Sequence, residues 1–199
     1  MTTLYLPGWA TLPTLFPNYH DANTVHLPGP MMSYYPEFFD AIAEPLHVVG
    51  FSLGCYLAQD FFRAHPSKVL SMTFHGARPQ YPDSDVQGVR KAVSQTPSRT
   101  RAYLTQFYKA CFTNPIEHAL FKTTLEASFL DTFTQPLLEE GLDYIATSKL
   151  DGGLLQQVPN LSICHGQEDA IAPFFETENF CTEFSLPFFP HPGGHSIPT

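Results

Sequence analysis

The chain has 199 residues, of which 43% are hydrophobic and 14% aromatic, and its formal net charge at pH 7 is −9. This length and composition predict one globular domain, or one domain with an insertion, and the acidic balance argues against nucleic acid as a partner. The chain holds no apolar run of the roughly 18 residues that a membrane helix needs and begins without a basic leader, so we expect a cytoplasmic protein with no membrane span.

The four cysteines show no C-x-x-C spacing. We expect them to be reduced and to behave as small hydrophobic residues. They are Cys55, Cys111, Cys164 and Cys181.

The first part of the chain predicts strands that alternate with helices. Short apolar runs at residues 3–6, 23–27 and 68–74 are typical of buried strands, and each is followed by a loop with proline or glycine. Residues 34–46 carry apolar side chains at helical spacing and predict an amphipathic helix. This alternation indicates a mostly parallel sheet covered by helices on both faces.

Gly50-Phe51-Ser52-Leu53-Gly54 is the most informative stretch of the sequence. A β-branched apolar run precedes it and a helix-forming run follows it, so it predicts a strand, a tight turn and a helix. This G-x-S-x-G pattern is typical of a nucleophile elbow, in which the serine takes strained backbone angles and both glycines avoid clashes with neighbouring elements. The alternative is a chance occurrence of the pattern in a loop.

Residues 81–151 break the alternation. They show helical periodicity in short pieces, interrupted by Pro97, Pro115 and Pro136. Such a stretch between two strands predicts a helical lid, so we expect residues 1–80 and 152–199 to form the core and residues 81–151 the lid. The helical pieces are expected at residues 89–93, 101–112, 116–129 and 136–150.

After the lid, the sequence predicts a strand at residues 161–164, a short helix at 176–183 and a last strand at 184–189. Asp169 follows the first of these strands and His195, preceded by two glycines, follows the last.

A serine nucleophile needs an imidazole base, and the base needs a carboxylate that fixes its tautomer. Loops at the carboxyl ends of parallel strands meet at one edge of the sheet, so we expect Ser52, Asp169 and His195 to converge there. Glu168 is the alternative carboxylate, and the alternative bases are His165, His191 and His75.

Taken together, these motifs resemble the α/β-hydrolase family over nearly the whole chain. They are Pro-Gly-Trp at 7–9, Leu-Pro-Gly at 27–29, the elbow, H-G-x-x-D-x-x-x-P at 165–173 and Gly-Gly-His at 193–195. The resemblance implies an α/β-hydrolase fold with a shortened, mostly parallel sheet of about six strands and a helical lid. It also implies serine esterase chemistry without a cofactor or metal, with Trp9 and Leu53 supplying the backbone N–H groups of the oxyanion hole.

Two departures from the family pattern stand out. Pro7 occupies a position where most members have histidine, and the first two strands and the final helix of the usual fold are not recognisable in this sequence. Trp9 is expected to form one wall of the acyl pocket. The lid phenylalanines are expected in the lid core, with one of them in contact with substrate: Phe107, Phe112, Phe121 and Phe129.

Within the family, the chain is most similar to esterases that demethylate pimeloyl-acyl-carrier-protein methyl ester in biotin synthesis. Those enzymes dock an acidic carrier protein on a basic lid. Between residues 78 and 122 the chain has seven basic residues against three acidic ones, a net charge of +4 that would steer such a carrier. The basic residues expected to bind it are Arg90, Lys91, Arg99, Arg101 and Lys109.

Other functions stay open at this point. A general short-chain carboxylesterase or thioesterase fits the same motifs, and so does a related lyase of menaquinone synthesis. The Pro7 substitution and the unrecognised strands also fit a non-catalytic binding protein on a hydrolase scaffold. The basic segment could be only a solvated face.

Overall fold

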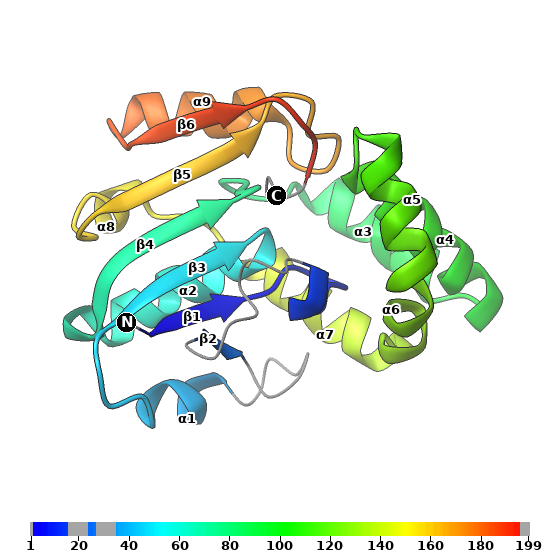
Figure 1. Ribbon diagram of the computed structural model, residues 1–199, viewed down its shortest axis with the longest axis horizontal. Helices are drawn as coiled ribbons and strands as arrows, with labels where there is room; N and C mark the ends of the chain where they lie inside the picture. The colour runs from blue at the N-terminus through cyan, green and yellow to red at the C-terminus, as the bar shows by residue number, and fades with distance from the viewer. Residues whose placement is uncertain (1, 16–23, 27–34, 196–199) are drawn as a thin grey trace.

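The computed structural model describes residues 2–15, 24–26 and 35–195. Six strands form one sheet in the order β2-β1-β3-β4-β5-β6, and every neighbouring pair is parallel (Figure 1). The predicted parallel sheet of about six strands is therefore confirmed. The strands are β1 (Thr3–Leu6), β2 (Thr24–His26), β3 (Leu46–Phe51), β4 (Val69–His75), β5 (Leu161–Gly166) and β6 (Phe188–His191).

Helices of the described residues pack against one face of the sheet. Leu4, Leu6 and Val48 point from β1 and β3 into the main core, which also holds the apolar face of α2 (Leu53–Ala64). The opposite face carries a separate small cluster of Tyr5, Val49 and Phe51. Helices on both faces were expected, and the described part of the chain shows them on one. α1 (Tyr35–Asp40), α8 (Gly152–Leu155) and α9 (Phe174–Glu183) complete this layer.

Six α-helices lie between β4 and β5 in the chain, and the first five of them, α3 to α7, stand to one side of the sheet (Figure 1). Prolines expected to break helices instead occupy their first turn, where a missing N–H costs nothing. The piece expected at 116–129 is two helices that meet at Leu125, and the piece expected at 89–93 begins at Asp83. The helices are α3 (Asp83–Val93), α4 (Pro97–Cys111), α5 (Pro115–Thr124), α6 (Glu126–Thr132) and α7 (Gln135–Thr147).

Two further boundaries differ from the sequence prediction. α1 ends at Asp40. The predicted helix through residue 46 is excluded by Pro45, because the helical conformation is disfavoured at the residue before a proline. The last strand begins at Phe188 instead of residue 184, because Phe184 still caps α9 and Ser185 has a positive φ of 52°. None of the helices in the described ranges is long and apolar enough to cross a membrane.

Candidate active site

The turn between β3 and α2 has the backbone of a nucleophile elbow. Ser52 has φ 53° and ψ −117°, a strained conformation held by a hydrogen bond from its N–H to the His75 carbonyl at 2.9 Å. A Cβ on Gly54 would lie 2.0 Å from the Leu6 carbonyl oxygen, and one on Gly50 would lie 2.7 Å from the Gly54 carbonyl oxygen. Both flanking glycines are therefore required by backbone atoms that have no room to move.

The Gly8-Trp9 turn lies directly against Ser52. A Cβ on Gly8 would be 3.0 Å from the Ser52 Cβ, so the backbone after β1 approaches the serine closely. Leu53 is the first residue of α2, where a backbone N–H has no partner within the helix. This arrangement brings the two backbone segments expected to form an oxyanion hole to the same serine.

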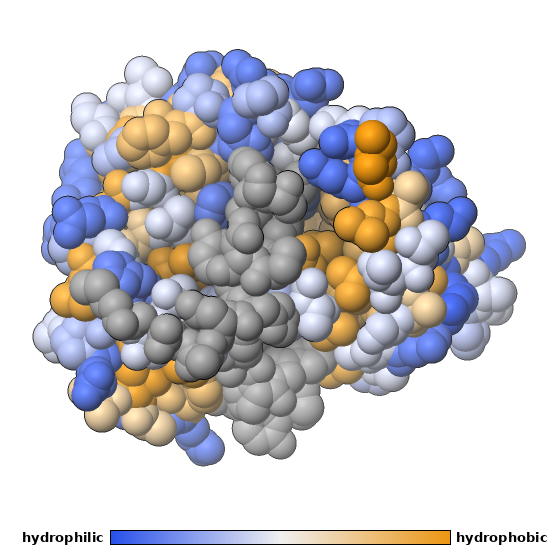
Figure 2. All heavy atoms as spheres, in the orientation of Figure 1, coloured by the Kyte–Doolittle hydropathy of each residue, from blue (hydrophilic) through white to orange (hydrophobic). Residues whose placement is uncertain are grey.

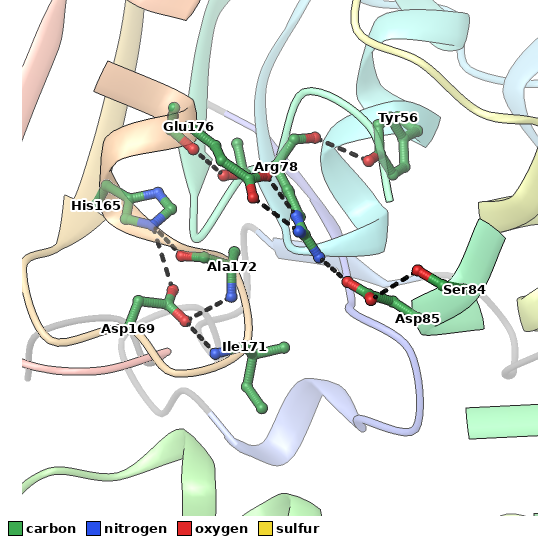
Figure 3. A network of polar contacts seen from close by, with 11 residues as sticks. Tyr56, Arg78, Ser84, Asp85, His165, Asp169, Ile171, Ala172 and Glu176 are labelled. Atoms are coloured by element: carbon green, nitrogen blue, oxygen red, sulfur yellow. Dashed lines mark hydrogen bonds and ion pairs between the residues drawn. The ribbon is translucent and has the colours of Figure 1, made fainter. Parts of the chain in front are cut away.

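Asp169 and His195 meet at the carboxyl edge of the sheet. The His195 Nδ1 donates to Asp169 Oδ2 at 2.7 Å, and both side chains are buried. The other carboxylate oxygen, Oδ1, accepts the backbone N–H groups of Ile171 and Ala172 at 2.8 Å each (Figure 3). Because an ionised carboxylate only accepts hydrogen bonds, the imidazole proton is fixed on Nδ1 and Nε2 is left as a base.

The environment keeps the Asp169 carboxyl ionised. Burial would raise its pKa, but the His195 side chain, the hydrogen bond between them and the Ala172 amide outweigh burial, so the pKa lies below its ordinary value. Among the described residues the buried His195 Nε2 has no hydrogen-bond partner, and none joins it to Ser52. The base therefore has an unused acceptor.

The imidazole of His195 lies beside the elbow. Its ring centroid is 5.0 Å from that of Phe51, the residue before Ser52. A Cβ on Gly76 would lie 2.9 Å from His195 Cε1, and Gly76 follows the residue whose carbonyl accepts the Ser52 N–H. Ser52 thus lies at the end of β3, and the His195 ring, which comes from the segment after β6, lies at the end of the neighbouring β4.

The alternative site residues have other surroundings. Glu168 is exposed, whereas the neighbouring Asp169 is buried. His165 is buried, its pKa is lowered by that burial, and its Nε2 pairs with the Ala172 carbonyl at 2.8 Å, so it supports the loop that carries Asp169. His75 is also buried, and burial together with His191 lowers its pKa to about 4.

A cavity of about 180 Å³ opens at Ser52 and is mostly apolar. Trp9 lines it, and its indole Nε1 donates to the Leu138 carbonyl of α7 at 3.0 Å. Phe107 also lines the cavity and contacts Trp9 edge-on, with ring centroids 5.2 Å apart. The remaining lining residues are Arg78, Tyr81, Asp85, Val86, Val89, Tyr103, Leu142, Ile145, Ala170 and Ile171.

The other three lid phenylalanines pack against one another. Phe121 has ring centroids 5.4 Å from Phe112 and 5.2 Å from Phe129, and none of the three lines the cavity at Ser52. A larger cavity of about 800 Å³ contains none of the predicted site residues. In the part of the chain that the structure describes, no cluster of side chains is arranged to hold a metal ion.

Two cavity residues were not predicted from the sequence. Arg78 is buried and forms a bidentate ion pair with Glu176 at 2.6 and 2.8 Å, while its third nitrogen donates to Asp85 at 2.8 Å (Figure 3). Its guanidinium carbon lies 4.9 Å from the ring centroid of Tyr81. Tyr81 lines the same cavity as Ser52, and a lone tyrosine in a turn gives no sequence signal for such a position.

The lid is less basic than the count over residues 78–122 indicated. Over residues 81–151 the chain has seven basic and nine acidic residues, a net charge of −2. Arg90 pairs with Glu139 at 2.5 Å and Asp143 at 2.7 Å, and Arg101 pairs with Asp131 at 2.8 Å. The three acidic partners follow residue 122, so the earlier count left them out.

Known structures share this architecture. An esterase from Exiguobacterium antarcticum is 16% identical with a TM-score of 0.74, covering 98% of this chain and 85% of that one. A bromoperoxidase from Bacillus anthracis is 15% identical with a TM-score of 0.72, covering 98% and 84%. BioG from Haemophilus influenzae is 12% identical with a TM-score of 0.66, covering 98% and 89%.

These likenesses, which include a deep-sea metagenome α/β-hydrolase, show that the chain has the α/β-hydrolase fold. No family model and no curated protein matches the sequence. Because one fold supports many activities, function has to be argued from the site.

Proposed function

We propose that this protein is a serine hydrolase that cleaves carboxylic esters through an acyl-enzyme. The observation that carries the proposal is the 2.7 Å hydrogen bond between Asp169 and His195, which leaves Nε2 unpartnered among the described residues beside a strained serine. These are the positions that a nucleophile, a base and an orienting carboxylate need.

In this mechanism Ser52 Oγ attacks the ester carbonyl while His195 Nε2 takes its proton. Asp169, already ionised, stabilises the imidazolium that forms. His195 then returns the proton to the alcohol, which leaves, and a water molecule hydrolyses the acyl-enzyme by the same steps in reverse.

The backbone N–H groups of Trp9 and Leu53 would stabilise the oxyanion. Loss of one such donor typically costs about 2.7 to 4 kcal/mol in the barrier. The bond from the Trp9 indole to the Leu138 carbonyl ties this turn to α7, so the lid helps to hold the donor in position.

For the substrate, we propose the methyl ester of a carrier-linked pimeloyl group, as the sequence resemblance implies. Lys91, Arg99 and Lys109 support it, because they are exposed and no carboxylate of the described residues pairs with them. Ile116 and Leu120 leave apolar side chains exposed on α5. Figure 2 shows hydrophobic surface over this part of the lid. Exposed cations and exposed apolar side chains on the same lid match an acidic carrier with an apolar contact surface.

A short-chain carboxylesterase or thioesterase is the second candidate, and the cavity favours it. Its volume of about 180 Å³ is below the roughly 300 to 1,000 Å³ of pockets that take drug-sized ligands. A small acyl group fits this space as it stands, whereas a longer chain requires the lid to move.

A substrate panel separates these functions. Carrier-linked pimeloyl methyl ester, free dimethyl pimelate, p-nitrophenyl acetate and an acetyl thioester are assayed at low and high salt, with Ser52→Ala as the blank. Carrier docking predicts that kcat/KM for the linked ester alone falls with salt and with Lys109→Glu, because screening weakens the attraction of exposed charges. The matched control is Lys149→Glu, an exposed lysine outside the proposed docking set.

Equal salt dependence for free and linked esters would refute carrier docking and leave the general esterase. Absence of hydrolysis with every substrate would refute the hydrolase and support a binding protein on this scaffold.

A further inference from the structure

We infer that Tyr81 is a further catalytic residue, whose hydroxyl donates a hydrogen bond to the leaving-group oxygen of the ester. The inference rests on the proposed ester hydrolysis and assigns a role within it.

Tyr81 reaches the reacting atoms from the segment between β4 and α3. Its side chain and Ser52 line the same cavity of about 180 Å³, which places the two side chains close together. In the tetrahedral intermediate, the former carbonyl oxygen and the alkoxy oxygen share one carbon with Ser52 Oγ, so both lie near it. A donor beside Oγ therefore comes within reach of one of these two oxygens.

The sheet order decides which oxygen Tyr81 meets. β1 and β4 flank β3 on opposite sides, and the Gly8-Trp9 turn with its oxyanion donor follows β1. The segment that carries Tyr81 follows β4, and the His195 ring lies against Gly76 at the start of that segment. Since the leaving oxygen receives its proton from His195, it departs on the β4 side. Tyr81 is thus placed for the alkoxy oxygen and the backbone amides for the oxyanion.

An ion network around the buried Arg78 holds the ring of Tyr81. The Arg78 guanidinium lies 4.9 Å from the ring centroid, a distance at which a cation attracts the face of an aromatic ring. Arg78 is fixed by Glu176 of α9 and Asp85 of α3 (Figure 3). Its charge is therefore already neutralised, which leaves it to brace Tyr81 and not to bind an anionic substrate.

The phenol stays protonated as the reaction requires. Burial raises the pKa of Tyr81 above its ordinary value, despite the opposing effect of Ser52. As the intermediate collapses, the bond between the carbonyl carbon and the alkoxy oxygen breaks, and its electron pair goes to that oxygen. The oxygen takes a proton from His195 Nε2, while Tyr81 keeps its own proton and contributes only the hydrogen bond.

Two butyrate esters test this role because their leaving groups differ. An ethoxide leaving group depends on hydrogen bonding and protonation, whereas p-nitrophenolate carries its charge with little help. We expect Tyr81→Phe to lower kcat/KM for ethyl butyrate by about 10-fold or more through kcat, and for p-nitrophenyl butyrate by less than about 3-fold. Tyr103→Phe, which alters another tyrosine of the cavity, should change kcat/KM by the same factor for both esters.

A fluorophosphonate has fluoride as its leaving group, so the rate at which it labels Tyr81→Phe should stay within about 3-fold of wild type. This labelling also shows that the variant folds. Equal losses on both esters, or no loss on either, would overturn the role of Tyr81 while leaving ester hydrolysis intact. A wild-type protein that cleaves neither of these esters nor any substrate of the panel described above would overturn both proposals.

Discussion

Replacement of Asp169 by asparagine tests the candidate triad, because the structure dictates how the amide must sit. Oδ1 accepts two backbone N–H groups at 2.8 Å, so the asparagine oxygen has to take that place. The amide NH₂ then faces His195 Nδ1, where the carboxylate oxygen was bonded at 2.7 Å. Two donors cannot face each other, so the imidazole proton moves to Nε2, and the base that Ser52 needs is lost.

The expected loss in kcat is large and the loss in stability is small. A wrong tautomer of this kind lowers kcat about 10⁴-fold in a triad protease. At about 1.36 kcal/mol for each factor of ten, that is roughly 5 kcal/mol in the barrier. The backbone bonds to Oδ1 persist, so we expect the free energy of unfolding to change by no more than about 1 to 2 kcal/mol.

The assay is hydrolysis of p-nitrophenyl acetate by Asp169→Asn, with urea unfolding as the check on folding. Glu168→Gln is the matched control, since it removes the neighbouring exposed carboxylate and should keep kcat within about 2-fold of wild type. A folded Asp169→Asn that keeps more than a tenth of the wild-type kcat would refute the role of Asp169. A loss in Glu168→Gln instead would assign the acid to the residue next to it.

Two further predictions concern stability. The folded-state pKa of Asp169 lies below the unfolded value of about 3.9, so its stabilising contribution is complete above that pH and is lost as pH falls through the folded pKa. Urea unfolding should therefore show that the difference in free energy of unfolding between wild type and Asp169→Asn shrinks below about pH 4. A difference that stays constant with pH would contradict this. Gly141→Ala places a Cβ 2.6 Å from the buried Trp9 indole, whereas Gly88→Ala meets nothing within 4 Å. Both variants gain about 1 kcal/mol of helix propensity, so this effect cancels in the comparison. Thermal melts should show that Gly141→Ala is less stable than Gly88→Ala by roughly 1 to 3 kcal/mol, the cost of overpacking. Equal melting temperatures would contradict the packing of Gly141 against Trp9.

Local backbone constraints made the elbow predictable from the sequence. Gly50 is required by contacts within its own strand, turn and helix, and Gly54 by the end of the neighbouring β1, so both glycines of the pentapeptide report the elbow. The parallel sheet followed from the alternation of apolar runs with helical ones. The order of Ser52, Asp169 and His195 then indicated which loops meet.

Features that depend on distant contacts could not be predicted. From the sequence, Arg78 is one of seven basic residues in a basic segment. Nothing nearby in the chain shows that Glu176, 98 residues further on, forms an ion pair with it. The acidic partners of Arg90 and Arg101 also come from later helices, which turned an expected basic lid into a mixed one. The helix break at Leu125 has no proline or glycine to mark it.

The central claim is that Ser52 is a nucleophile activated by His195. Reaction with a fluorophosphonate, followed by intact-mass measurement and peptide mapping, tests it most directly. We predict one adduct per chain on the peptide that contains Ser52, no adduct in Ser52→Ala, and labelling slowed at least 100-fold in His195→Gln. An unlabelled wild-type protein, or an adduct on another residue, would contradict the claim.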